Sequence, residues 1–418
     1  MASAASGRTA FLALAGTLLA RNPAAPVLPT PTGPFTVGTT AVFLVDSSRR
    51  DPIAHDRFGG RAVPVQLWYP ASTGANGARA PYLLEPGLRP AFLSQGYYGI
   101  DSALIASWND VDTHAFLGVG VARGRHALVM LVGGLGVARA HYTAFAVELA
   151  SHGYIVAVAD LPYEGFAVLP GGVTATAGDD SANSLDDAAV QRRQAAGWAA
   201  DLSFVLNRLQ HGSLTGVSAD VADAIDWSRV GAFGHSSGGL IAVEACNHDP
   251  RIRACVNLDG GPLDPHGQPI ADFVRAGLAR PTLFLLEQPV YSDSDLARRH
   301  LTRAQFEARG RGFPEMLDSL ARRGPGPLLV ARITGTGHMS FSDAPFVMPA
   351  TITRFGGRII EARRGFEIIA VTVRTFFDGA LANGDVRSVT ALPTRYPELG
   401  FTEPDGRSDF TGGARSEP

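Results

Sequence analysis

The sequence predicts an α/β fold with a mainly parallel central sheet, helices on both of its faces and antiparallel strands at its N-terminal edge. Short apolar runs alternate with helical patterns along most of the 418 residues, as in a parallel sheet covered by helices. The apolar runs are nearly continuous in Val, Ala and Leu, which suits strands buried on both faces. The opening segments VGTTAVFLVD and AVPVQLWYP are typical of β-strands, and we expect them to be antiparallel strands at one edge.

The predicted elements follow one another in a regular order. The first buried strand is expected at 126–134, followed by a helix near 141–152 and a strand at 154–160. Residues 186–209 have apolar side chains at helical spacing and predict a long amphipathic helix. The remaining elements are, in order, a strand at 229–233, a helix at 237–246, strands at 254–258 and 282–287, a helical region at 295–323, a strand at 328–333 and a helix near 365–381. This is the order of an α/β-hydrolase sheet.

The chain divides into one catalytic domain with an extension at each end. In residues 1–34 an apolar run, AFLALAGTLLA, precedes several prolines. This pattern indicates a signal peptide and a Pro-rich linker, so we expect export to the periplasm or medium; the alternative is a frayed cytoplasmic N-terminus. Residues 35–383 are expected to form the α/β-hydrolase domain, in which the Gly-, Ala- and Ser-rich segment 165–186 is a surface loop, either a lid or an inert excursion. Residues 384–418 predict an extended tail without a core of its own.

The composition excludes several classes of function. The chain is 45% hydrophobic and 18% charged, with a net charge of -3 and scattered Arg pairs, so no basic footprint for nucleic acid is present. No segment beyond the N-terminal run could anchor in a membrane. No zinc-type Cys/His spacing occurs, and we expect neither a metal nor a cofactor. Cys246 and Cys255 lie in apolar contexts, which favours buried free thiols over a disulfide.

The stretch VGAFGHSSGGLIAVEA contains the pattern Gly-x-Ser-x-Gly at 234–238. The pattern alone is weak in a chain with 48 glycines, but here it falls between a predicted strand and a predicted helix, where a nucleophile elbow requires a sharp turn. Glycines on each side remove Cβ atoms that would collide with strand and helix, and so expose the Ser236 hydroxyl. The alternative is a Gly-rich turn with a capping serine. We interpret Ser236 as a catalytic nucleophile.

A serine nucleophile needs a base, and His338 is the best candidate among eleven histidines. It lies in ITGTGHMSF directly after the last predicted strand, where a loop can bring an imidazole over the carboxyl edge of the sheet. His235 lies inside the turn, and we expect it to pack or hydrogen-bond locally. The histidines expected to be ordinary surface or packing residues are His141, His152 and His248.

The base needs an orienting acid, and Asp259 in VNLDGG is preferred. An apolar strand brings it rigidly to the same edge of the sheet, and the two glycines after it let the backbone turn away at once. Asp259 as a simple turn or cap residue is the alternative role. The alternative acids follow the next predicted strand and are Glu287, Asp293 and Asp295.

The oxyanion that forms during acyl transfer needs preorganised amide donors. One is expected from Ser237, directly after the nucleophile, and the other from the Gly-rich loop 133–136 after the first buried strand. This loop lacks the Lys-Ser/Thr of a phosphate-binding loop, so a nucleotide site is not indicated.

Several segments spread over roughly 33–397 resemble a known family as a set. They are RAVPVQLWYPA, GGLGVARAHYTAFAVELASHGYIVAVAD, DLPYEGFAV, GHSSGG, NLDGG and GTGHMSFSD. Together they look like the platelet-activating-factor acetylhydrolase family, of the plasma and intracellular type II kind and its bacterial relatives. The elbow is shared by most serine esterases, whereas an acid at the end of the very next strand is more particular to this family.

The resemblance implies an activity and a set of site residues. The family hydrolyses short or oxidised acyl chains from the sn-2 position of phospholipids without a metal. The implied site residues are the nucleophile Ser236, the acid Asp259, the base His338 and the oxyanion-hole amides of Leu135 and Ser237. The sequence departs from the family at Gly133–Gly134, where relatives often carry a His, and at Ser237, where they often carry an aromatic residue. Both departures border the acyl pocket and concern substrate choice more than mechanism.

The sequence therefore predicts a serine ester hydrolase that cleaves short acyl chains from phospholipid-like or other small esters through an acyl-enzyme. Within this class the alternative is a general short-chain carboxylesterase or polyester hydrolase. From another class, the alternative is a catalytically silent α/β-hydrolase-fold binding protein. Tyr97–Tyr98 and 339–348 line either an apolar acyl pocket or ordinary core. The expected partners are small-molecule or lipid esters, with transient contact with lipid surfaces; no oligomeric state is predicted.

Overall fold

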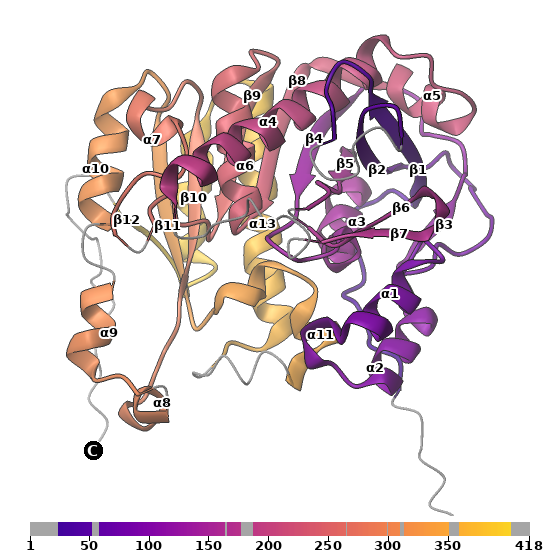
Figure 1. Ribbon diagram of the computed structural model, residues 1–418. Coiled ribbons are helices and arrows are strands. Elements are labelled where there is room, and N and C mark those ends of the chain that lie inside the picture. The colour runs from indigo at the N-terminus through magenta and orange to yellow at the C-terminus, as the bar shows by residue number, and fades with distance from the viewer. Residues whose placement is uncertain are drawn as a thin grey trace, which may run out of the picture.

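A ten-stranded sheet forms the centre of the molecule (Figure 1). The computed structural model describes residues 24–51, 58–163, 165–176, 187–264, 266–298, 300–309, 313–350 and 359–402. The strands of the sheet are β1 (Val37–Asp46), β2 (Arg61–Pro70), β3 (Ala115–Leu117), β4 (His126–Val132), β5 (Ile155–Ala159), β8 (Ile225–His235), β9 (Ile252–Leu258), β10 (Thr282–Gln288), β11 (Leu328–Thr334) and β12 (Leu399–Thr402). They lie in the order β12-β11-β10-β9-β8-β4-β5-β2-β1-β3.

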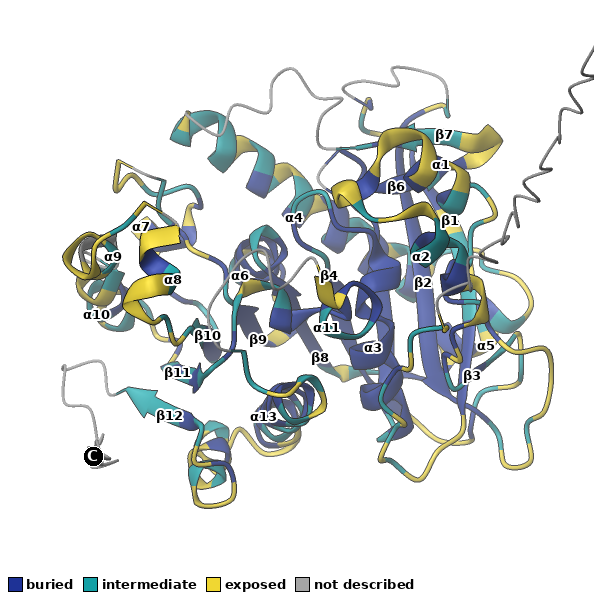
Figure 2. Ribbon diagram, turned by 90° about the horizontal axis from the view of Figure 1, so that it is seen from below, coloured by how far each residue is buried: buried dark blue, intermediate teal, exposed yellow. Residues whose placement is uncertain are grey.

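The middle of the sheet is parallel and its N-terminal edge contains antiparallel strands, as predicted. The strands from β5 through β4, β8, β9 and β10 to β11 pair in parallel. At the N-terminal edge β2 runs antiparallel to both β5 and β1, while the short β3 pairs in parallel with β1. The central strands are buried along their length (Figure 2), which agrees with their continuous apolar sequences.

Helices cover both faces of the sheet. The helices are α1 (Leu88–Gln95), α2 (Ser102–Ser107), α3 (Thr143–Ser151), α4 (Ala188–His211), α5 (Val217–Asp223), α6 (Ser237–His248), α7 (Phe273–Ala276), α8 (Asp293–Arg298), α9 (Arg303–Arg309), α10 (Phe313–Arg323), α11 (Ala344–Val347) and α13 (Ala362–Ala382). One apolar core lies beneath α3 and α13, and a second lies beneath α4, α6 and α10 on the opposite face. The α/β-hydrolase class is thus confirmed. The helical region expected at 295–323 contains the end of α8 together with α9 and α10.

The described part of the N-terminal extension is packed against the domain. Leu28 is buried, and the Thr32 backbone amide donates to Glu148 Oε2 at 2.8 Å. Gly33 donates its amide to Ser151 Oγ at 3.0 Å, so the Pro-rich segment is attached along α3. The apolar run expected to be a signal peptide lies outside the described residues. None of the described helices combines the length and apolar character that a membrane span requires.

The prediction that the C-terminal tail is extended is wrong for residues 386–402, which pack against the core of the domain. A 3-10 helix, η7 (Val386–Thr394), packs against α13, and β12 adds an antiparallel strand to β11. Val389, Tyr396 and Leu399 are buried in the same core as α13. Three apolar anchors among many polar residues are enough to attach this segment, and hydropathy averaged along the tail does not reveal them.

The prediction of a surface loop at 165–186 is also wrong for its first part. Two short strands, β6 (Ala167–Leu169) and β7 (Val173–Ala175), form an antiparallel hairpin around a turn with Gly171 and Gly172 at positive φ. Ala167, Leu169 and Ala175 of this hairpin are buried in a small cluster of their own. Residues 177–186 lie outside the described part of the chain.

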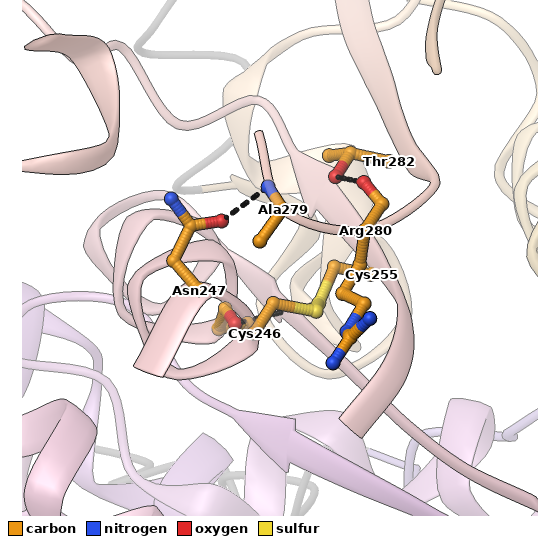
Figure 3. Close-up of a disulfide and its surroundings, with 7 residues drawn as sticks. Cys246, Asn247, Cys255, Ala279, Arg280 and Thr282 are labelled. Atoms are coloured by element: carbon orange, nitrogen blue, oxygen red, sulfur yellow. Dashed lines mark hydrogen bonds between the residues drawn. A yellow bond between two sulfur atoms is a disulfide. The ribbon is translucent and has the colours of Figure 1, made fainter. Parts of the chain in front are cut away.

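The expectation of free thiols is wrong as well, because Cys246 and Cys255 form a disulfide (Figure 3). Cys246 lies near the end of α6 and Cys255 in β9, with 6.5 Å between their Cα atoms. A reversal of direction through 249–251 brings the end of the helix back beside the next strand. Two cysteines nine positions apart can therefore meet inside the core, although neither belongs to a recognisable cysteine framework.

The disulfide should add measurably to stability. In the chain-entropy account, closing a loop of this size contributes about 2–3 kcal/mol. We therefore expect the double variant Cys246→Ala, Cys255→Ala to lose about this much unfolding free energy in urea titrations. Reduced wild-type protein is the matched control and should behave like the variant. Two titratable thiols in the unreduced, denatured wild type would contradict the assignment.

Candidate active site

Ser236 lies in a tight turn between β8 and α6. Its backbone has φ 57° and ψ -127°, a strained conformation for a residue with a Cβ atom. A Cβ on Gly238 would overlap the carbonyl oxygens of Val132 and Gly133. One on Gly234 would overlap the carbonyl of Gly238 itself. The turn thus requires glycine at both positions, and it is the strand-to-helix turn that a nucleophile elbow needs.

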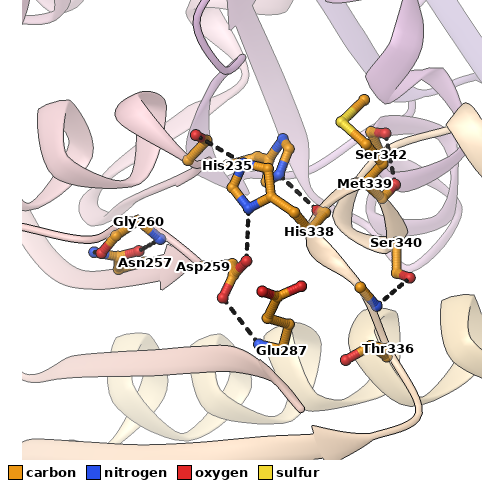
Figure 4. Close-up of polar contacts among 12 residues, drawn as sticks. His235, Asn257, Asp259, Gly260, Glu287, Thr336, His338, Met339, Ser340 and Ser342 are labelled. Carbon is orange, nitrogen blue, oxygen red and sulfur yellow. Dashed lines mark hydrogen bonds and ion pairs between the residues drawn. The ribbon is translucent and has the colours of Figure 1, made fainter. Parts of the chain in front are cut away.

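Three side chains far apart in the sequence converge at one edge of the sheet, and Figure 4 shows the contact between two of them, His338 and Asp259. The distance from His338 Nε2 to Ser236 Oγ is 3.0 Å, and that from His338 Nδ1 to Asp259 Oδ2 is 2.6 Å. Ser236, Asp259 and His338 follow β8, β9 and β11, respectively. The carboxyl ends of these strands lie at the same edge of the sheet because the strands are parallel. The structure therefore brings together the residues expected as nucleophile, acid and base.

The hydrogen bonds define the tautomer of His338. An ionised carboxylate only accepts hydrogen bonds, so Nδ1 carries the proton that is donated to Asp259. Nε2 then has a free lone pair facing the hydroxyl of Ser236. This is the arrangement in which an imidazole can remove a proton from a serine.

The carboxylate of Asp259 is held by the backbone around it. Asp259 has φ 58°, and its Oδ1 accepts a hydrogen bond from the Glu287 amide at 2.9 Å. The turn after β9 is closed by Asn257, whose Oδ1 accepts from the Gly260 amide at 2.6 Å and whose Nδ2 donates to the Gly260 carbonyl at 3.1 Å. The sequence prediction missed Asn257 and the Glu287 amide. The Asn in NLDGG was the sequence feature from which the turn contact of Asn257 could have been predicted.

The three alternative acids, Glu287, Asp293 and Asp295, make other contacts in the part of the chain that the structure describes. Glu287 supports Asp259 through its amide, and its carboxylate adds negative charge near His338. Asp293 pairs with Arg303 at 2.7 Å at an exposed position of α8. Asp295 accepts hydrogen bonds from Ser292, beside the start of the same helix.

Two opposing effects determine the pKa of His338. Burial of the imidazole acts to lower this pKa, since it disfavours the charged form. The hydrogen bond and charge of Asp259, together with the charge of Glu287, act in the opposite direction and prevail. The pKa of His338 therefore lies above its ordinary value.

The Gly-rich loop 133–136 lies directly against the nucleophile. A Cβ on Gly134 would lie 3.1 Å from Ser236 Cβ. The Gly134 amide donates to Tyr142 Oη at 2.8 Å, so it is not available to an oxyanion, and Leu135 supplies the next amide along the loop. Ser237 is the first residue of α6, where the amide has no partner within the helix. Ser237 thus directly follows Ser236 in the turn, and Leu135 belongs to the loop that lies against this turn.

Aromatic residues on η1 (Tyr97–Gly99) cover the far side of this loop. Tyr97 is buried beside Phe92, and its Oη accepts from the Ala138 amide at 3.4 Å. Tyr98 has φ 47° and is 38% exposed, and its Oη would lie 3.6 Å from a Cβ on Gly136. Tyr97 is therefore core, whereas Tyr98 presents a phenol near the site. The other segment considered as a pocket wall is 339–348, and its residue Met348 is part of the buried core.

The other histidines singled out in the sequence differ in the range of their contacts: two bond within one helical turn, and two bond residues far away in the sequence. His152 and His248 each hydrogen-bond a glutamate one turn away on their own helices, at 3.1 and 2.8 Å. His141 is buried against Tyr82 Oη, at 2.9 Å from its Nδ1. His235 contacts Tyr142 and the backbone of His338. Within the described residues, no group of three or more His, Cys, Asp or Glu side chains is placed to hold a metal ion.

The chain matches a family model over most of its length. The model is described as platelet-activating factor acetylhydrolase, isoform II, and it matches residues 27–161 and 217–378. The first range contains the loop 133–136, and the second contains Ser236, Asp259 and His338.

Individual relatives agree with this match. A probable 1-alkyl-2-acetylglycerophosphocholine esterase of Arthroderma benhamiae is 25% identical over 437 residues, covering 94% of this chain and 99% of the relative. The platelet-activating factor acetylhydrolase of Cavia porcellus is 27% identical over 200 residues, covering 41% of this chain and 42% of that enzyme. The solved structure of a ferulic acid esterase from Streptomyces cinnamoneus superposes with a TM-score of 0.69 and 29% identity, covering 91% of this chain and all of that one.

The tightness of the turn at Ser236 can be tested with two glycine substitutions. Gly238→Ala should destabilise the protein by about 3 kcal/mol or more, because its Cβ would meet backbone that cannot move away. Gly197→Ala, in the interior of α4 with no atom within 4 Å of the new Cβ, should stabilise by about 0.5–1 kcal/mol. Thermal unfolding measures both. Equal effects of the two substitutions would contradict the tight turn.

Proposed function

The chain belongs to the platelet-activating factor acetylhydrolase isoform II family and is a carboxylic ester hydrolase, and we propose that Ser236, His338 and Asp259 form its catalytic triad. The observation that supports the triad best is the single hydrogen-bonded series from Ser236 Oγ through both ring nitrogens of His338 to Asp259 Oδ2. A silent scaffold would have no need of a serine strained at positive φ beside such an imidazole.

The reaction follows from the geometry of these groups. His338 Nε2 removes the proton as Ser236 Oγ attacks the ester carbonyl, and Asp259 stabilises the imidazolium that forms. The negative charge on the tetrahedral oxygen is held by the Leu135 and Ser237 amides. His338 then protonates the departing alcohol oxygen, which leaves an acyl-Ser236. Water, activated by the same imidazole, hydrolyses this intermediate and restores the hydroxyl.

The substrate we propose is an ester with a short acyl chain on a phospholipid-like alcohol. The support is the fungal relative, which aligns over nearly the whole chain and is named for an alkyl-acetyl-glycerophosphocholine. Such substrates are presented at lipid surfaces. The exposed Leu93 and Tyr98, on the consecutive elements α1 and η1, supply apolar surface for a transient contact there.

A second candidate substrate is an ester of an aromatic acid. The ferulic acid esterase is 29% identical over 91% of this chain, and the phenol of Tyr98 lies beside the loop that carries the proposed oxyanion donor Leu135. An aromatic side chain at that place could stack on a planar acyl group. General short-chain esters form the third class.

Export is proposed on two grounds. The apolar run near the N-terminus fits a signal peptide. The buried Cys246–Cys255 disulfide is of the kind that persists in oxidising compartments. Removal of the signal peptide is tested by comparing the mass of the protein recovered outside native cells with the mass of the full-length chain.

The proposed function is tested by turnover with a matched pair of proteins. Wild type should hydrolyse an acetyl-phospholipid analogue, and Ser236→Ala should lose about 10³- to 10⁶-fold in kcat. Methyl ferulate and p-nitrophenyl butyrate complete the panel. A higher kcat/KM on either of these would transfer the assignment to the corresponding ester class. Turnover that survives Ser236→Ala, or folded protein that no fluorophosphonate labels, would contradict a serine esterase.

The pH dependence follows from the raised pKa of His338. Only the neutral imidazole accepts a proton, so kcat/KM should be full at high pH and fall as pH drops through this pKa, with a midpoint above the ordinary value of about 6.5. In Asp259→Asn the main effect that raises this pKa is lost, so the midpoint should move to lower pH while kcat drops about 10⁴-fold. A midpoint unchanged by Asp259→Asn would contradict the assigned acid.

A further inference from the structure

His235, the residue just before the proposed nucleophile, is fully enclosed and hydrogen-bonded at both ring nitrogens. It is 1% exposed. Its Nδ1 lies 3.0 Å from Tyr142 Oη. Its Nε2 lies 2.8 Å from the backbone carbonyl oxygen of His338, a contact that Figure 4 shows. Its ring also lies 4.6 Å from the His338 ring, measured between centroids. His235 therefore contacts the proposed base through both its backbone and its ring.

The direction of each hydrogen bond is fixed by chemistry. A carbonyl oxygen only accepts, so His235 Nε2 carries a proton and donates it to the His338 carbonyl. Burial, together with the nearby imidazole of His338, holds the pKa of His235 well below its ordinary value, so the ring is neutral and Nδ1 is an acceptor. Tyr142 must then donate its hydroxyl proton to Nδ1.

Tyr142 continues the series to the oxyanion loop. Its oxygen accepts the Gly134 amide at 2.8 Å. The hydrogen bonds therefore run in one direction, from the Gly134 amide through the Tyr142 hydroxyl and the His235 ring to the His338 carbonyl. Leu135, the proposed oxyanion donor, is the residue after the start of this series, and the proposed base is its end.

Two glycines make room for this series. A Cβ on Gly133 would lie 2.8 Å from a ring carbon of Tyr142, and one on Gly134 would lie 3.4 Å from His235 Nδ1. Tyr142 is buried with no exposed surface, so its ring cannot swing away. The departure from the family pattern at Gly133–Gly134 thus coincides with the space that the Tyr142 ring occupies.

We propose that Tyr142 and His235 are positioning residues that fix the oxyanion loop and the backbone of the catalytic histidine relative to each other. The inference rests on the proposed function and goes beyond it. The two ring hydrogen bonds of His338 orient its imidazole only if its backbone is fixed, and His235 supplies a bond to that backbone. In the same way, the bond from Gly134 to Tyr142 fixes the loop one residue before Leu135.

The test compares variants that break the series with one that restores it. Tyr142→Phe and His235→Leu should each lower kcat about 10- to 100-fold with KM within about twofold, because misplacing a base or an oxyanion donor by a fraction of an ångström slows the chemical step. His235→Gln, whose amide can both donate and accept, should regain part of the loss. The double variant should be no slower than the slower single variant, since both break one series.

The readout is kcat per active site, counted by fluorophosphonate labelling to completion, with thermal unfolding measured in parallel. Tyr69→Phe is the matched control, because it also removes a hydroxyl from a buried tyrosine. The Tyr69 hydroxyl donates to the Val119 carbonyl oxygen at 2.7 Å, and its loss should leave kcat unchanged.

Three results would overturn the positioning role. The first is a wild-type kcat per labelled site in Tyr142→Phe, even if this variant is less stable. The second is a kcat in His235→Gln that is no higher than in His235→Leu. The third is a double variant whose loss of kcat is the product of the losses in the two single variants. Tyr142→Phe removes a single oxygen and so keeps the test valid if His235→Leu does not fold. Wild-type turnover that survives Ser236→Ala would instead overturn the proposed function, which separates the two failures.

Discussion

The backbone contact between the turn at Ser236 and the end of β4 is the constraint on which the site depends. The turn is so close to the carbonyl oxygens of Val132 and Gly133 that no side chain fits at Gly238. This closeness places the loop after β4 within reach of the nucleophile, and the loop can then supply an amide to the reacting carbonyl. A looser turn would leave Ser236 a capping residue of an ordinary helix.

The parallel sheet supplies the other half of the geometry. Ser236, Asp259 and His338 are brought to one edge because β8, β9 and β11 run in the same direction. Strand ends alone do not align hydrogen bonds, and the fine placement comes from polar contacts made by neighbouring residues. Asn257 closes the turn beside Asp259, and the Glu287 amide holds its second oxygen.

How much of the structure could be predicted from the sequence depends on how far apart in the chain the interacting residues lie. The fold class, the elbow and the convergence of Asp259 and His338 follow from local patterns combined with the rule that parallel strands share an edge. The disulfide was missed because it depends on how the end of α6 returns beside β9, which no cysteine spacing encodes. The attachment of β12 was missed for a similar reason, since a four-residue strand has meaning only beside β11. His235 was expected to bond locally, but its partners lie 93 and 103 residues away, and only the folded structure identifies them.

The disulfide also determines how the site responds to cleavage of the chain. The cross-link joins the helix that begins just after the proposed nucleophile to the strand that ends just before the proposed acid. Between the two cysteines lies a surface turn in which Pro250 is exposed. A protease that cut this turn would leave both catalytic segments covalently connected through sulfur. The nicked molecule would remain a single covalent species, and the two segments could not diffuse apart.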